Sequence, residues 1–169
     1  MDLGESIARQ TSFAIRLSMR VGAAVASDCN LVSSPLSVHL VLALVAAGSK
    51  GRTLDEILSL LGLSSGKLTD LNSLSSQIVS LVLADGSPSG GPRVSFANGV
   101  FVDSSVTLKP SFNDIVANTF KAEVKAVDFR TKVTFSIPIY IVLSQESFFE
   151  KLAYIISSRY VFLLQNIGH

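Results

Sequence analysis

Residues 36–47 form an uncharged run that is apolar on nearly every face of a helix. Ser34 is a favourable N-cap, Pro35 suits the first helical turn, and Gly48 follows the run. A helix that is apolar all round must be covered on all sides. Other helices and a sheet can supply that cover. The run therefore predicts a central buried helix in a layered fold.

Three further helices are predicted before residue 85. Residues 3–26, 53–61 and 68–82 all carry apolar side chains at helical spacing. Thr53 and Glu56 have the spacing of a capping box, and Gly62 stops the helix that they open. The predicted inward positions are Ile7, Ala14, Leu17, Val21 and Ala24 in the first helix, Leu54, Ile57, Leu58 and Leu61 in the second, and Leu68, Leu71, Leu74, Ile78, Leu81 and Val82 in the third.

The period of the pattern changes after residues 85–92, whose composition predicts a surface loop. Apolar residues at even spacing predict a strand over residues 93–102, and alternation over residues 123–129 predicts another. Between them, residues 110–120 have one apolar helical face. Helices and strands in this order predict an α+β fold.

Composition excludes several functional classes. There are 14 basic and 13 acidic residues, and the basic residues form no cluster. Neither a nucleic acid nor an anionic membrane is therefore predicted as a partner. The lone Cys29 allows no internal disulfide, and with two histidines it cannot complete a usual zinc site. The polar start, with Asp2 and Glu5, does not resemble a secretory signal, so we expect a cytoplasmic protein. No metal or cofactor is predicted.

No arrangement typical of catalysis is present. His39 lies within the apolar run, and the spacing suggests neither a nucleophile nor an orienting acid beside it. We therefore expect His39 to be a buried, hydrogen-bonded structural residue. Cys29 is interpreted as a structural thiol, and Asp55 and Glu56 as charges near a helix N-terminus. The sequence predicts no catalytic residue and no enzyme activity.

Two ordered motifs carry a family resemblance. Together they resemble the N-terminal part of serpins, in particular plant-type serpins, over residues 1–132. The first motif consists of Asn30, Ser34, Pro35, Ser37, Gly48, Gly51 and Thr53, and the second of Asn98, Gly99, Phe101, Leu108, Phe112, Ala122, Glu123, Val127, Asp128 and Phe129.

The resemblance implies both a fold and a function. In the serpin fold, residues 34–47 are the central helix, with Ser34 and Ser37 under the region where the main sheet opens. Residues 93–102 and 123–129 are then neighbouring strands of that sheet. Serpins inhibit serine-type endopeptidases by a suicide mechanism, in which a cleaved reactive loop inserts into the sheet. The implied partners are serine or papain-like cysteine proteases, and the family also allows an extracellular location.

Residues 133–169 differ in composition from residues 1–132. They contain all three tyrosines and six of the eleven isoleucines of the chain. We expect a partial serpin domain at residues 1–132 and a poorly packed tail at residues 133–169 that does not belong to the family. No residue matches the reactive loop, so the sequence predicts a truncated and inactive inhibitor.

Two alternatives to an inactive inhibitor remain open from the sequence. The strand at residues 93–102 would lack one neighbour, so the chain could be a binding fragment that pairs, or self-associates, through an exposed strand edge. The tail could instead anchor a membrane variant. Its apolar run at residues 133–143 argues against this because it has about half of the roughly 20 residues that a spanning helix needs.

Overall fold

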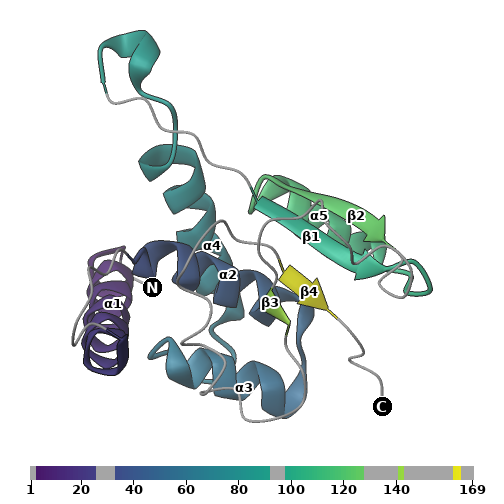
Figure 1. Ribbon diagram of the computed structural model, residues 1–169, viewed down its shortest axis with the longest axis horizontal. Helices are drawn as coiled ribbons and strands as arrows, with labels where there is room; N and C mark the ends of the chain where they lie inside the picture. Colours follow the sequence, from purple (N-terminus) through teal and green to yellow (C-terminus); the bar gives the residue numbers. More distant parts are fainter. Residues whose placement is uncertain (1–2, 26–32, 92–97, 128–140, 143–161, 165–169) are drawn as a thin grey trace.

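The computed structural model describes residues 3–25, 33–91, 98–127, 141–142 and 162–164. In these ranges α1 to α4 cluster on one side of the molecule, and α5 lies with β1 and β2 on the other (Figure 1). The four strands form one sheet. The elements are α1 (Leu3–Val25), α2 (Pro35–Gly48), α3 (Gly51–Leu60), α4 (Leu68–Gln77), the π-helix η1 (Ile78–Val82), the 3₁₀ helix η2 (Ser87–Ser89), β1 (Asn98–Asp103), α5 (Pro110–Asn118), β2 (Ala122–Val127), β3 (Ile141–Val142) and β4 (Phe162–Leu164).

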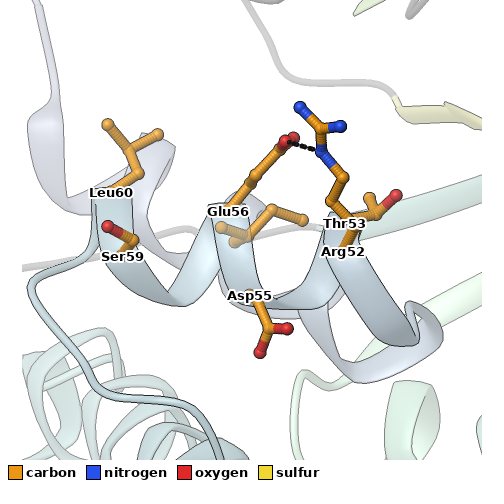
Figure 2. A pocket seen from close by; sticks show the side chains of 7 residues that line it. Arg52, Thr53, Asp55, Glu56, Ser59 and Leu60 are labelled. Atoms are coloured by element: carbon orange, nitrogen blue, oxygen red, sulfur yellow. Dashed lines mark hydrogen bonds and ion pairs between the residues drawn. The ribbon is translucent and has the colours of Figure 1, made fainter.

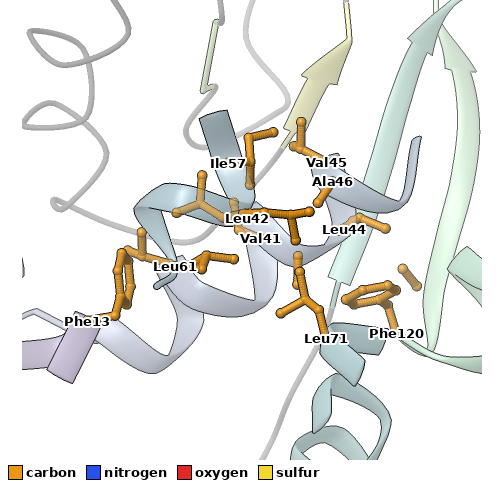
Figure 3. Close-up of a cluster of buried hydrophobic side chains, with 14 of the residues drawn as sticks. Phe13, Val41, Leu42, Leu44, Val45, Ala46, Ile57, Leu61, Leu71 and Phe120 are labelled. Atoms are coloured by element: carbon orange, nitrogen blue, oxygen red, sulfur yellow. The ribbon is translucent and has the colours of Figure 1, made fainter. Parts of the chain in front are cut away.

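Helix α2 is the centre of the core, as its sequence predicts. Residues 38–46 are all buried, so no face of the helix is left to solvent over that length. Helices α1, α3, α4 and α5 all contact it. Figure 3 shows Phe13 of α1 near one end of this cluster and Phe120, just after α5, near the other. The prediction of a helix covered on every side is confirmed.

The inward face of α1 is only partly as predicted. Leu17 and Val21 are buried and Ala14 is half-buried, but Ile7 is 51% exposed and Ala24 is exposed. The predicted burial of Ile7 is wrong because Ile7 lies about 100° around the helix from Ser6, which belongs to the buried row. The buried row of α1 consists of Ser6, Phe13, Leu17 and Val21.

The capping box predicted for α3 is wrong. The helix begins at Gly51 with Lys50 as its N-cap, so Thr53 already lies inside the first turn and its side chain caps nothing. Glu56 instead accepts a hydrogen bond from Arg52 Nε at 2.7 Å. The predicted stop is confirmed, because Gly62 has a φ of +77°, a conformation that favours glycine.

The apolar stripe of α4 is confirmed only as far as Ile78. Leu81 and Val82 are 74% and 61% exposed, so their predicted burial is wrong. The chain changes to a π-helix at Ile78, and the amide of Leu83 donates to the carbonyl of Ile78 at 3.0 Å. A π-turn holds more residues than an α-turn, so it rotates the following side chains out of the stripe.

Strands β1 and β2 are parallel neighbours, with Asn98 opposite Ala122 and Asp103 opposite Val127. Val100 and Val102 are buried, which confirms the predicted alternation in the described part of that strand. Residues 93–97 of the predicted strand precede β1 and lie outside the described residues. Two sequence segments predicted to be adjacent strands are therefore adjacent.

The predicted open edge of β1 is wrong. Strand β4 pairs with it in parallel, from Val100 opposite Phe162 to Val102 opposite Leu164, and β3 pairs with β4. The sheet order is β2-β1-β4-β3. Two short tail segments thus pair within the sheet, and the expectation of a poorly packed tail stays a prediction for the rest of residues 133–169. Ladder bonds use backbone groups, so pairing does not require the side-chain alternation that the tail lacks. The rest of residues 133–169 lies outside the described residues.

None of the helices in the described ranges has the length and hydropathy needed to cross a membrane. The apolar run at residues 133–143, except for Ile141–Val142, lies outside those ranges.

Candidate functional site at the ends of helix α2

The N-terminal end of α2 presents two serine hydroxyls. Ser34 is the N-cap, and its Oγ accepts from the amide of Ser37 at 3.4 Å. The two Oγ atoms are 2.9 Å apart, so one hydroxyl donates to the other. Pro35 occupies the first turn, where no amide donor is needed. Each hydroxyl has further capacity to donate or accept, so this end can bind a neighbouring backbone.

The C-terminal end of α2 depends on a glycine for close packing. A Cβ on Gly48 would lie 2.9 Å from Cε2 of Phe112, so the absent side chain leaves room for the Phe112 ring of α5. The 14 residues of α2 span about 20 Å. Ser34 and Gly48 therefore belong to two separate contacts at opposite ends of one helix.

Asn98 joins β1 to the segment that follows α5. Its Nδ2 donates to the carbonyl of Phe120 at 3.1 Å, and the Phe120 ring is fully buried. Next to it, a Cβ on Gly99 would lie 3.0 Å from the Phe101 ring. The Asn98 bond fixes the sheet against the segment after α5, whereas the contact between Gly99 and Phe101 lies within β1. Two other predicted motif residues, Asn30 and Phe129, lie outside the described residues.

His39 is buried as predicted, with 2% of its surface exposed. The prediction that it is hydrogen-bonded is wrong, because neither ring nitrogen has a partner among the described residues. The ring instead meets Phe13 of α1 edge to face, with centroids 5.7 Å apart. Burial lowers the pKa of His39 from 6.5 to about 4, so the imidazole is neutral at pH 7. No pattern in the sequence indicates this partner, which comes from another helix.

A pocket of about 740 Å³ runs along α3, and Thr53 is one of its lining residues (Figure 2). Its charged groups already have neighbours. Glu56 raises the pKa of Arg52 above its ordinary value by hydrogen bonding and by charge, and Asp55 Oδ1 accepts from Ser65 Oγ at 2.8 Å. The described lining consists of Arg52, Thr53, Asp55, Glu56, Ile57, Ser59 and Leu60, all from α3.

This pocket does not have the features of an active site. Its lining comes from a single helix, so within the described ranges no second element brings a reactive group opposite to it. The described residues also contain no cluster of three or more His, Cys, Asp or Glu that could hold a metal ion. Asp55 and Glu56 thus serve in local pairs, and their interpretation as charges at the helix N-terminus is wrong, because α3 begins at Gly51 and has no acidic residue in its first turn.

A helix buried all round, sharing one hydrophobic cluster with a parallel strand pair and joined to it through α5, defines an α+β scaffold. The family described as serpin (serine protease inhibitor) matches residues 8–139. Serpin-Z7 of Hordeum vulgare is 47% identical over 133 residues, and Serpin-ZXA of Oryza sativa subsp. japonica is 49% identical over 135. The chain belongs to the serpin family.

The solved structure of Arabidopsis AtSerpin1 in its native stressed conformation has the same fold over this region. It aligns with a TM-score of 0.71 and 45% identity, and the match covers 78% of this chain and 33% of that one. Serpin-Z7 and Serpin-ZXA are likewise covered over 34% of their length, so the chain spans about a third of the relatives it matches. The family match continues to residue 139, beyond residue 132, where the predicted resemblance ends.

Proposed function

We propose that residues 1–132 are the N-terminal scaffold of a protease inhibitor that acts by loop insertion. One observation carries this proposal: buried helix α2 shares a hydrophobic cluster with the parallel pair β1–β2, in a fold that aligns with the native stressed conformation of AtSerpin1 at a TM-score of 0.71. The target class in this proposal is a serine protease or a papain-like cysteine protease.

The role of these residues in such an inhibitor would be mechanical. Insertion of a cleaved loop adds a strand to the main sheet, and the sheet must open to receive it. A rigid layer beneath the sheet lets the strands separate without disturbing the core. Helix α2 has this character because its residues 38–46 are buried among four helices. Ser34 and Ser37 offer hydroxyls at the end of α2 where the proposed opening occurs.

We further propose that residues 1–169 alone do not inhibit proteases. In the proposed mechanism a protease must cleave a reactive loop, and no residue of this sequence matches that loop. A supporting fact is that the chain spans about a third of its relatives. The chain should therefore form no covalent complex with trypsin, chymotrypsin or papain on denaturing gels. A stable band at the summed mass would contradict this part of the proposal.

A hybrid protein tests the scaffold role separately. Residues 33–127 would replace the aligned segment of AtSerpin1, which keeps its own reactive loop. If these residues are a competent scaffold, the hybrid should form a covalent complex with a protease that AtSerpin1 itself traps. The matched control is the same hybrid with the reactive-loop cleavage site removed, which should form none. A folded hybrid that is cleaved as an ordinary substrate would refute the scaffold role.

A further inference from the structure

Two Ser-Pro dipeptides occur in the sequence, and they differ in the element that they begin. Ser34–Pro35 begins α2, and the Ser34 hydroxyl is hydrogen-bonded as an N-cap. Ser87–Pro88 begins η2, where every side chain is exposed. Figure 1 shows this segment, between α4 and β1, far from the helix cluster and the sheet. Ser34 is also exposed, but it caps a helix of the core, so only the second dipeptide can change shape without disturbing a buried element.

Local hydrogen bonds hold the turn around Ser87. Asp85 Oδ1 accepts from the amide of Ser87 at 3.0 Å, and the carbonyl of Gly86 accepts from the Ser89 hydroxyl at 3.0 Å and the Gly91 amide at 2.9 Å. The Ser87 hydroxyl has no partner among the described residues. Because no buried side chain is released, opening this turn costs little free energy. An enzyme can thus bind the segment in an extended form.

We propose that Ser87 is a phosphorylation site for a proline-directed protein kinase that uses MgATP. The Ser87 Oγ attacks the γ-phosphorus of ATP, and the bond from that phosphorus to the β–γ bridging oxygen breaks. The hydroxyl proton passes to the catalytic aspartate of the kinase, and ADP leaves. Pro88 lacks an amide donor and has a fixed φ, which gives the kinase a chemical mark directly after the accepting serine.

The phosphate would also change the turn. It adds a charge of about −2 next to Asp85, whose carboxylate accepts from the Ser87 amide. Residues 83–91 contain no lysine or arginine to offset that charge. Repulsion between the phosphate and the Asp85 carboxylate therefore weakens the bond that begins the turn. Phosphorylation is expected to open residues 85–91 while leaving the buried helices unchanged.

The test incubates the chain with MgATP and a mitogen-activated protein kinase, followed by peptide mass spectrometry. One phosphoryl group is expected, on Ser87, and none on Ser34. Ser87→Ala should abolish incorporation and Pro88→Ala should reduce its rate at least tenfold. Ser89→Ala is the matched control, because this exposed serine precedes glycine, and it should retain the wild-type rate. Wild-type incorporation into Ser87→Ala, or no effect of Pro88→Ala, would overturn the proposal.

A peptide of residues 83–91 separates recognition of the sequence from access in the fold. If the kinase modifies both the peptide and the chain at Ser87, the site is usable in the folded protein. If it modifies the peptide alone, the fold shields Ser87 and the proposal fails. Amide hydrogen exchange then checks the consequence: Ser87, Ser89 and Gly91 should exchange faster after phosphorylation. Unchanged exchange would refute the opening of the turn.

Discussion

Protonation of His39 makes the stability of the fold depend on pH. Its pKa is about 4 in the folded chain and near 6.5 when unfolded, so protons bind the unfolded state more tightly. The stability that the neutral ring contributes is complete above pH 6.5 and is lost as the pH falls towards 4. Between pH 7 and pH 5 this amounts to about 2 kcal/mol.

The variant His39→Leu isolates this effect, because it keeps an apolar side chain of similar size against Phe13. Urea unfolding at pH 7 and pH 5 should show a loss of stability in the wild type that is about 2 kcal/mol larger than in the variant. Carboxylates elsewhere titrate in both proteins and cancel in the comparison. Equal pH dependence in the two proteins would show that His39 does not titrate as a buried neutral group.

Gly48 and Gly22 lie in two helices but should respond oppositely to alanine. A Cβ on Gly48 would come within 2.9 Å of the Phe112 ring, so Gly48→Ala should destabilise the fold by about 1–3 kcal/mol through overpacking. Gly22 has no atom within 4 Å of its Cβ position, so Gly22→Ala should stabilise α1 by about 0.5–1 kcal/mol. Thermal unfolding measures both. Stabilisation by Gly48→Ala would mean that the ring moves freely.

At the scale of elements, two arginines of α1 hold the end of α3. Arg9 Nη1 donates to the carbonyl of Gly62, and Arg16 Nη2 donates to the carbonyl of Leu60 at 3.1 Å. These carbonyls lie at the C-terminal end of α3, where the helix dipole favours a positive charge. Neither contact could be predicted from the sequence, because more than 40 residues separate the partners.

Replacing both arginines with methionine keeps much of the side-chain packing and removes the donors. The double variant should lose about 1–3 kcal/mol in urea unfolding, the lower end reflecting solvent exposure of Arg16. Arg20→Met is the matched control on the same helix, where the described residues provide no such carbonyl, and it should change stability by under about 0.5 kcal/mol. If Arg20→Met lost as much stability as the double variant, the loss would come from helix propensity or charge and not from the two hydrogen bonds.

The sequence predicted which elements exist better than it predicted how they end and turn. Helix α2 was predictable because an uncharged run between Ser34 and Gly48 has few alternatives. The π-turn at Ile78 was not, because the stripe from Leu68 to Val82 suits an unbroken α-helix equally well. At the candidate site, the Ser34 cap follows from local sequence, whereas the contact between Gly48 and Phe112 depends on where α5 packs.

At the scale of the whole molecule, the burial of α2 by neighbouring elements decides whether residues 1–169 fold as a unit. If this helix lacked partners and the edge of β1 stayed open, the chain would be expected to be molten or to self-associate. In the structure, residues 38–46 are buried by elements that lie within this chain, and β4 covers the edge of β1. Both premises of that expectation are therefore wrong, and we now expect a cooperative monomer.

Pairing of β4 with β1 is the contact on which this expectation most depends. Leu163 lies opposite Phe101, between the two end pairs of a three-residue ladder. Leu163→Pro should disrupt that ladder, since proline lacks the amide donor and fits poorly within a sheet. The edge of β1, with its unpaired backbone groups, would then favour association with a second chain. Light scattering during thermal unfolding should show a concentration-independent monomer for the wild type and a concentration-dependent associating species for the variant.

Asn166→Pro, beyond the end of β4, is the control and should behave as the wild type. If Leu163→Pro also remains a monomer with an unchanged transition, the tail strand does not protect the sheet, and the core around α2 alone keeps the chain folded and unassociated.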